Sequence, residues 1–307
     1  MKKIYPTNRD LQDQQGFTLV EILVALTLGL LVTATTLQIF FSSKRAYLMQ
    51  EQSSRLQENG SYALELLSRY IRMTGYIDNT PAIGNNPANI RDKNNFSFTA
   101  TGAIQGMCGQ GSESFTGREI VTGFDSNNMG DCIIIRYHGS DDGSMVDCFG
   151  SNTTTQNGQQ QIINGDQTIV NAIFVAQDTT NGLALSCRSR TLNNIGGTIQ
   201  STPRQAFASG IENIQIRYGI NNSGNPNNGV QTYVNADNVT NWNTVISVQI
   251  ALLVSSDPGV NITDQPQSYV FPPWNNTPTQ ANDFRLRRIF TTTINLRNQS
   301  QNFNVAP

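Results

Sequence analysis

One apolar stretch, residues 17–41, constrains this chain more than any other feature of its sequence. Nearly every side chain in it is apolar, small or a hydroxyl, and Glu21 carries its only charge. The length is that of a membrane-spanning helix, which needs about 20 apolar residues. An ionised carboxylate in such a helix costs on the order of 2.5–3.5 kcal/mol by insertion scales. Glu21 therefore needs a partner of opposite charge.

A cut between Gly16 and Phe17 would create that partner, because the new α-amino group of Phe17 is positively charged. The sequence GFTLVEILVAL, behind a short polar leader, resembles the type IV prepilin signal. The resemblance implies a protein that is trimmed by a dedicated inner-membrane peptidase and built into a filament. It implies that Gly16 precedes the cut and that Phe17 becomes the N-methylated first residue. Glu21 would neutralise the Phe17 amine of its own or of a neighbouring subunit.

Two other interpretations of the apolar stretch compete with this one. An ordinary secretory signal places a small-residue cleavage site after its apolar region, and no such site precedes Lys44. A plain uncleaved anchor with a stray glutamate would leave room for a membrane-anchored periplasmic enzyme. The fixed spacing of a glycine, an aromatic residue, apolar residues and a glutamate favours the prepilin signal over both.

A single long helix is permitted over residues 17–73, because no proline interrupts residues 7–80. Its second half is amphipathic, and the expected buried stripe consists of Leu56, Ala63, Leu64, Leu67, Tyr70 and Ile71. Glu51 with Arg55, and Glu65 with Arg69, are i,i+4 ion pairs in the favourable order. Gly75 marks the end of the helix.

The remaining chain predicts an antiparallel sheet domain. A loop is expected over 79–117, and strands over 119–124, 131–138, 169–176, 183–188, 212–220, 245–254 and 285–296. In the sixth of these strands, the residues expected to face inward are Ile246, Val248, Ile250, Leu252 and Val254. The fold class is α+β, with a long N-terminal helix packed on the sheet and a disulfide-bearing insertion. Four segments are expected: a cytoplasmic leader (1–16), a transmembrane half-helix (17–41), an amphipathic periplasmic half-helix (42–73) and a periplasmic β-rich domain (74–307).

Four cysteines, Cys108, Cys132, Cys148 and Cys187, lie in the part that would be exported. They form no C-x-x-C pair and the chain has a single histidine, so no metal site is expected. An even number of cysteines in an oxidising compartment indicates disulfides. Three pairings are open. The sequential one, Cys108–Cys132 and Cys148–Cys187, closes the shorter loops, and the family resemblance also implies the second pair.

No catalytic constellation is recognisable, because nucleophilic catalysis of the common kinds needs a histidine near the nucleophile. His138 is the single histidine, and it closes a predicted strand. Asp141 and Asp142 indicate a turn. An enzyme is not expected, nor is a cofactor, and the absence of a basic field argues against nucleic-acid binding.

Three aromatic residues, Tyr269, Phe271 and Trp274, flank a proline pair before the last predicted strand. They either form a surface for a partner or hold the loop against the sheet, and the second interpretation is favoured.

Weaker similarities over most of the chain resemble the PilW-like minor pilins. They are ENGSYALELLSRYIRMTGY, DCIIIRYHG, IVNAIFVA, GIENIQIRYGI and RLRRIFTTTINLRN. The long domain and the absence of a mid-helix proline also favour a minor, low-copy subunit. The resemblance implies an inner-membrane protein with a periplasmic domain that enters the pilus and helps to start its assembly. The implied partners are other minor pilins, the major pilin, prepilin peptidase, the inner-membrane assembly platform and an adhesin-like tip protein. A minor pseudopilin of type II secretion is the nearest alternative.

Overall fold

The computed structural model describes residues 16–76, 120–122, 129–156, 158–165, 167–178, 182–192, 198–223, 228–240, 244–260, 263, 265–275 and 277–296. The chain divides into two compact units, Met1–Gln50 and Glu51–Pro307. A helix of 55 residues, α1 (Leu19–Met73), begins in the first unit and ends in the second. The predicted continuous helix is therefore confirmed. The loop expected over 79–117 lies outside the described residues.

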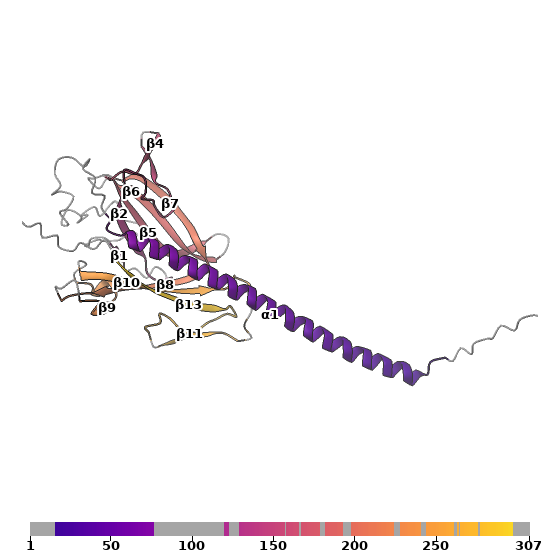
Figure 1. The fold of residues 1–307 in the computed structure, drawn as a ribbon. Helices are drawn as coiled ribbons and strands as arrows, with labels where there is room; N and C mark the ends of the chain where they lie inside the picture. Colours follow the sequence, from indigo (N-terminus) through magenta and orange to yellow (C-terminus); the bar gives the residue numbers. More distant parts are fainter. Residues whose placement is uncertain are drawn as a thin grey trace, which may run out of the picture. The chain divides into compact units, whose positions relative to one another are not determined.

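The second unit contains two main sheets, both antiparallel (Figure 1). The strand order of the five-stranded sheet is β1 (Ile120–Thr122), β2 (Ile133–His138), β5 (Thr168–Asp178), β6 (Gly182–Leu192) and β7 (Thr198–Ser209). The order of the four-stranded sheet is β13 (Arg287–Asn295), β10 (Val245–Ser255), β8 (Ile211–Ile220) and β9 (Thr232–Val234).

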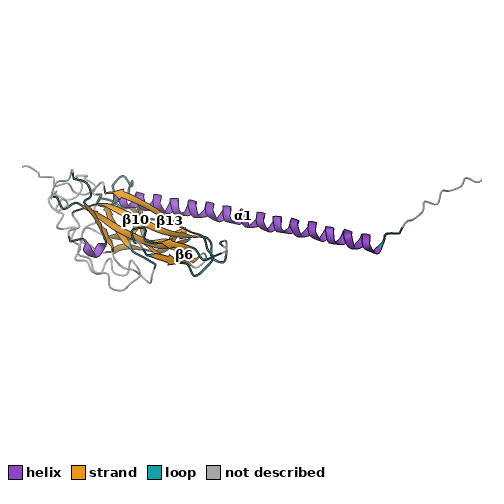
Figure 2. Cartoon of the chain, turned by 90° about the horizontal axis from the view of Figure 1, so that it is seen from below, coloured by secondary structure: helices purple, strands orange, loops and turns teal. Residues whose placement is uncertain are grey.

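Two hairpins and one short helix complete the described elements, and the short helix is the small purple one in Figure 2. The hairpins are β3 (Thr153–Gln156) with β4 (Gln159–Ile162), and β11 (Ser268–Val270) with β12 (Pro278–Gln280); the short 3-10 helix is η1 (Ala236–Asn238). The predicted α+β class is confirmed. Of the three described cysteines, Cys187 lies in β6 of the five-stranded sheet, and Cys132 and Cys148 lie in the segments on either side of β2.

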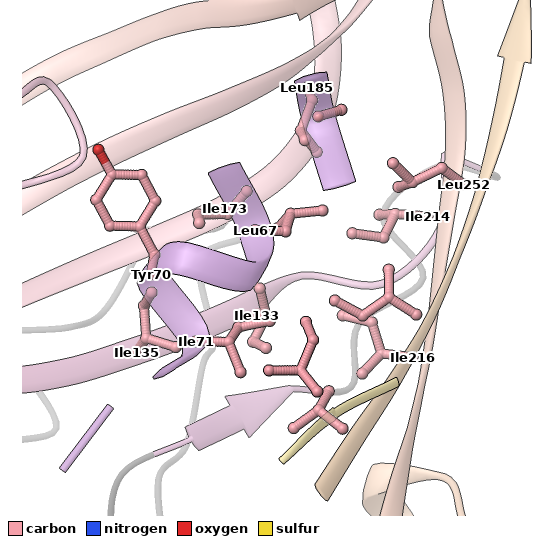
Figure 3. Packing of buried hydrophobic residues seen from close by; sticks show 14 of the residues in the cluster. Leu67, Tyr70, Ile71, Ile133, Ile135, Ile173, Leu185, Ile214, Ile216 and Leu252 are labelled. Atoms are coloured by element: carbon pink, nitrogen blue, oxygen red, sulfur yellow. The ribbon is translucent and has the colours of Figure 1, made fainter. Parts of the chain in front are cut away.

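One continuous core joins the C-terminal part of α1 to both sheets. The buried helix residues are Gln52, Leu56, Gly60, Ala63, Leu67, Tyr70 and Ile71. Figure 3 shows Leu67 and Ile71 between isoleucines of β2 and β5 on one side and isoleucines of β8 on the other. Each large apolar side chain buried in this way contributes about 1.5–3 kcal/mol. The amphipathic stripe therefore attaches the helix to two sheets at once.

The helix ends where the sequence predicts it to end. Gly75 has a φ of 72°, a left-handed conformation that glycine adopts without strain. Its N–H donates to the carbonyl of Arg136 (2.9 Å), and the N–H of His138 donates to the carbonyl of Tyr76 (2.9 Å). These bonds connect the turn after α1 to β2.

Two predictions of side-chain contacts need correction. Val245, and not Ile246, is in the core, because the pairing with β8 shifts between Val245 and Ser247 and moves the alternation by one residue. Of the two predicted helix ion pairs, Arg55 does pair with Glu51 at 3.0 Å. Glu65 and Arg69 are both exposed to solvent, and within the described part of the chain they form no ion pair.

Candidate assembly site

The N-terminal end of α1 is capped by a side chain that the sequence analysis did not single out. The Glu21 N–H donates to Thr18 Oγ1 at 3.3 Å, and the Ile22 N–H donates to the Thr18 carbonyl at 3.2 Å. A threonine at the N-cap with a glutamate three residues later is the capping-box pattern. Thr18 and Glu21 thus start the helix immediately after the predicted cleavage point, Gly16–Phe17. The pattern could have been read from the spacing alone.

Every side chain from residue 16 to residue 47 is exposed in the structure. Phe17 is 78 % exposed and Leu30 is 74 % exposed. Soluble monomers rarely expose a contiguous apolar patch larger than a few hundred Å². This part of α1 therefore needs lipid or other apolar helices around it.

The hydroxyl groups in the apolar stretch are satisfied within the helix. Four threonines donate to carbonyls three or four residues earlier, at 2.7–2.9 Å: Thr27, Thr33, Thr35 and Thr36. Such internal bonds remove the cost of placing a hydroxyl where no water can pair with it. By length and composition, α1 is a helix that could cross a membrane.

Glu21 is the chemical exception in this stretch. Its side chain is exposed and makes no ion pair with any described residue. It lies in the first turn of α1, where a negative charge is stabilised by the helix dipole by about 0.3–1 kcal/mol. That is less than the cost of burying a carboxylate in lipid, so the helix alone does not compensate for its charge.

The polar residues of the globular part form turns and strand ends. His138 ends β2, and its Nδ1 is 2.8 Å from the carbonyl of Gly165. The Asp142 carboxylate accepts hydrogen bonds from the Ser140 hydroxyl and from the Ser144 hydroxyl and N–H, which lower its pKa to about 2. Among the described residues, no three His, Cys, Asp or Glu side chains form a group that could hold a metal ion.

The aromatic residues before β13 contact arginines of the four-stranded sheet. The guanidinium of Arg217 lies 5.5 Å from the centre of the Trp274 ring, and that of Arg287 lies 5.8 Å from the centre of the Tyr269 ring. Cation–π contacts of this kind contribute about 0.5–2 kcal/mol. These contacts favour the interpretation that the aromatic residues hold the loop against the sheet.

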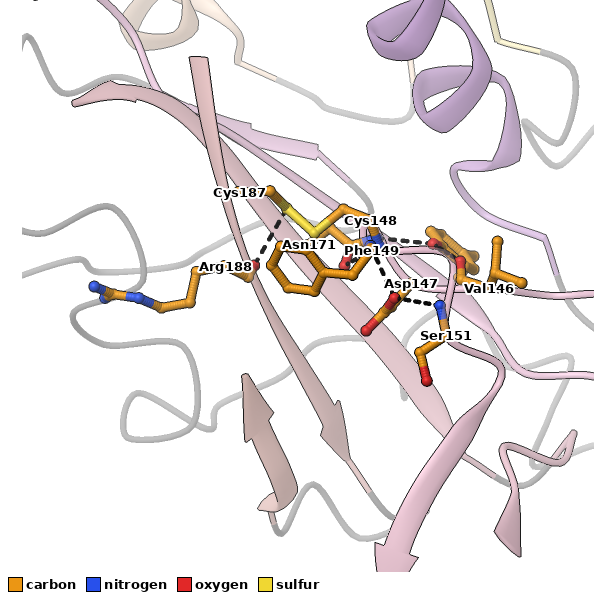
Figure 4. The surroundings of a disulfide bond; sticks show 9 residues. Val146, Asp147, Cys148, Phe149, Ser151, Asn171, Cys187 and Arg188 are labelled. Carbon is orange, nitrogen blue, oxygen red and sulfur yellow. Dashed lines mark hydrogen bonds between the residues drawn. A yellow bond between two sulfur atoms is a disulfide. The ribbon is translucent and has the colours of Figure 1, made fainter. Parts of the chain in front are cut away.

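A disulfide joins Cys148, in the segment between β2 and β3, to Cys187 in β6 (Figure 4). It is one of the two bonds in the expected sequential pairing. The segment is also held by hydrogen bonds: Asn171 Oδ1 accepts from the Cys148 N–H at 3.3 Å, and its Nδ2 donates to the Tyr137 hydroxyl at 2.7 Å. Cys132 is also disulfide-bonded. Its expected partner, Cys108, lies outside the described residues.

Comparison with known proteins gives two family matches at opposite ends of the chain. Residues 11–37 match the prokaryotic N-terminal methylation motif, and residues 173–298 match the family described as type IV pilus-assembly protein W. Among curated proteins, none matches the chain. Among solved structures, a type IV-like pilin from Thermus thermophilus is similar, with 17 % identity, a TM-score of 0.41, and coverage of 80 % of this chain and 99 % of that chain.

The methylation motif on a long exposed apolar helix, followed by antiparallel sheets, makes this chain similar to the membrane-anchored proteins of the type IV pilin class. Within that class the chain is PilW-like, since the matched region 173–298 covers much of β5 and the strands from β6 to β13.

Proposed function

We propose that this chain is a minor pilin that is cleaved between Gly16 and Phe17 and takes part in starting type IV pilus assembly. One observation carries the proposal. Glu21 lies in the first turn of a helix whose apolar side chains are all exposed over a membrane-spanning length. A carboxylate in that place is costly unless a positive charge joins it. Cleavage before Phe17 would create an ammonium group close to it.

Assembly follows from the same electrostatics. Before assembly, the Phe17 ammonium of the cleaved chain would be four residues from Glu21 of the same subunit. In a bundle of apolar helices, the carboxylate could instead meet the ammonium of a neighbouring subunit. Charges in an apolar bundle are weakly screened, and removing one partner of a buried pair costs about 3–5 kcal/mol. The pair would therefore align neighbouring subunits along the helix axis.

The proposed topology assigns one role to each segment. Residues 1–16 would form a cytoplasmic leader, and residues 17–41 would cross the inner membrane. Residues 42–73 and 74–307 would form the periplasmic half-helix and the globular domain. The disulfide between Cys148 and Cys187 supports this orientation, because disulfides persist in the periplasm and are rare in the cytosol.

The proposed partners are other minor pilins, the major pilin, prepilin peptidase and the assembly platform of the inner membrane. A low-copy position at the pilus tip, next to an adhesin-like protein, belongs to the same proposal. The match to a pilus-assembly family favours a pilus over a type II secretion pseudopilus. Deletion separates the two: a pilus subunit is needed for piliation, and a pseudopilin for export of a secreted protein.

Mass spectrometry of the mature protein from cells tests the proposal directly. The expected N-terminus is N-methylated Phe17. A Gly16→Ala variant should accumulate as the uncut precursor, visible as a slower band on a gel. Mature protein that still carries residues 1–16 would refute the proposed processing, and would return the uncleaved anchor as the better interpretation.

A further inference from the structure

The four edges of the two main sheets differ in how well they are protected. β1 and β9 are strands of three residues. β7 contains Pro203, and its pairing with β6 shifts three times. β13 pairs with β10 over nine residues without a shift and contains neither proline nor glycine. A long regular edge is a template for pairing with another chain, and proteins commonly blunt such edges.

The outward-facing residues of β13 are defined by two hydrogen bonds at its ends. The Ser256 N–H donates to the Leu286 carbonyl (2.8 Å), and the Leu296 N–H donates to the Ile246 carbonyl (3.0 Å). In an antiparallel ladder, every second residue directs its N–H and C=O toward the paired strand. Even-numbered residues from 286 to 296 therefore face β10. The residues that direct these groups away from the sheet are Arg287, Ile289, Thr291, Thr293 and Asn295.

A side-chain amide already occupies the first position of this open edge. The Arg287 N–H donates to Gln267 Oε1 at 2.7 Å, and Gln267 Nε2 donates to the Arg287 carbonyl at 3.0 Å. Gln267 thus makes the two bonds that a neighbouring strand would make. Within the described ranges, β13 pairs with β10 alone, and no comparable contact satisfies the outward backbone groups of Ile289, Thr291 or Thr293.

The position of Arg287 is itself fixed by ion pairs with two carboxylates. Its Nε donates to Glu212 Oε2 at 2.7 Å, and its Nη1 donates to Asp283 Oδ1 at 2.6 Å. The Arg287 side chain is only 8 % exposed. Arg285 Nη1 donates to the other oxygen of Glu212 at 2.8 Å. The edge is therefore a preformed and rigid surface where β13 begins.

The two faces next to this edge have different chemistry. On one face Thr291 and Thr293 are exposed. On the other face Phe290 and Leu296 pack against the core and remain partly exposed. An added strand with apolar side chains at alternate positions would cover Phe290 and Leu296 and continue the core. Its other side chains would lie beside the threonines.

We propose that the outer edge of β13, from Ile289 to Asn295, accepts an extended strand from another pilus subunit. The outward backbone N–H and C=O groups repeat at every second residue of β13, and this spacing matches the backbone of another extended strand. Binding of this kind is called strand addition. The identity of the partner as a pilus subunit rests on the proposed function. The geometry of the edge does not depend on it.

Proline substitutions at outward positions test this proposal. Thr291→Pro and Thr293→Pro remove an N–H that points away from β10, a place where edge strands tolerate proline. Thr291→Ala and Thr293→Ala keep the N–H and serve as matched controls. Each full-length variant is purified in detergent after co-expression with the other pilin-like subunits of its pilus. The alanine variants should retain the partner, and the proline variants should lose it by at least about tenfold. Retention of wild-type amounts by well-folded proline variants would overturn the proposal.

Hydrogen exchange of the wild-type chain gives a second readout that needs no substitution. The amides of Thr291 and Thr293 should exchange quickly in the chain alone, and at least about tenfold more slowly in the complex. The amide of Thr292, which faces β10, should be slow in both. If the outward amides exchange slowly in the chain alone, or if their protection rises with the concentration of the chain, the edge is covered by this chain itself or by a second copy. Either result would overturn the proposal. A wild-type chain that copurifies with no pilus subunit would instead refute the proposed function.

Discussion

Gly60 of α1 lies directly against the aromatic ring of Phe290 in β13. A Cβ atom placed on Gly60 would lie 2.6 Å from both Cδ2 and Cζ of that ring, closer than real contacts allow. Gly60 is buried, and Phe290 packs against the core that joins the helix to both sheets. The absence of a side chain at this one helix position therefore determines how closely α1 approaches the four-stranded sheet.

We expect Gly60→Ala to destabilise the globular domain despite the better helix propensity of alanine. Alanine gains about 1 kcal/mol in a helix interior, whereas overpacking a core costs about 1–3 kcal/mol. The net loss should be up to about 2 kcal/mol in urea unfolding. Gly60→Leu should lose more, and Phe290→Leu should partly rescue Gly60→Ala. Gly229→Ala is the control, because a Cβ there meets nothing within 4 Å. Equal stability of Gly60→Ala and the wild type without repacking of Phe290 would contradict this account.

Removal of the disulfide between Cys148 and Cys187 should destabilise the domain without unfolding it. The cysteines are 39 residues apart, and closing a loop of that length contributes roughly 4 kcal/mol on the chain-entropy model. Asn171 and Tyr137 still hold the segment by hydrogen bonds in the Cys148→Ala/Cys187→Ala variant. We expect a lower urea midpoint with a native near-ultraviolet spectrum. An unchanged urea midpoint would show that the disulfide contributes little to the stability of the domain.

The buried carboxyl group of Asp147 should make stability fall as pH rises. Burial raises the pKa of Asp147, although its Oδ1 accepts from the N–H groups of Phe149 and Ser151. The folded state then holds the proton more tightly than the unfolded state, whose pKa is about 3.9. This contribution is present below that value and is lost as pH rises through the raised folded value.

Asp147→Asn should therefore gain stability relative to the wild type as pH rises from 3 to 7, since the amide oxygen still accepts both bonds. Asp142→Asn serves as a control, because its stability relative to the wild type should change with pH in the opposite direction. The pKa of Asp142 is lowered to about 2, so the ionised carboxylate stabilises the fold at pH values above the pKa of the unfolded state. The Asp142→Asn substitution should therefore cost more stability as pH rises. Urea midpoints across this pH range check both directions. Parallel curves for Asp147→Asn and the wild type would contradict the assignment.

Two roles of Glu21 can be separated by substitution. If its negative charge matters for assembly, then Glu21→Gln should cripple piliation as severely as Glu21→Ala, although glutamine suits a capping box as well as glutamate does. Thr18→Ala should cost about 0.5–2 kcal/mol of helix stability at the cap. It should leave piliation largely intact. Piliation by Glu21→Gln at the wild-type level would assign Glu21 to the cap.

Helix α1 was predictable because its signals are local. The absence of proline permits a continuous helix, and Leu56, Leu67 and Ile71 recur at helical spacing. Gln52 and Gly60 are just as buried, and hydrophobicity does not identify them. The side-chain oxygen of Gln52 accepts from the Asp257 N–H (3.2 Å), and Gly60 lies against the Phe290 ring. Both contacts are with residues distant in the sequence.

The sheets were predictable where apolar alternation is regular, and not elsewhere. β8 alternates as expected, whereas the shift beside Val245 displaces Ile246 from the core. β7 was not predicted, because Pro203 and its polar composition resemble a loop and only an edge position tolerates them. Of the candidate site, Gly16, Phe17 and Glu21 came from a motif. The capping role of Thr18 was missed, although its spacing to Glu21 already gives the capping-box pattern.

The amide of Gln267 has a consequence for any chain that joins the open edge. It occupies the ladder position beside Arg287, so a partner strand can begin to pair only at Ile289. A slip of one residue would turn every side chain of the incoming strand to the opposite face. The glutamine therefore limits how far toward the start of β13 an added strand could extend.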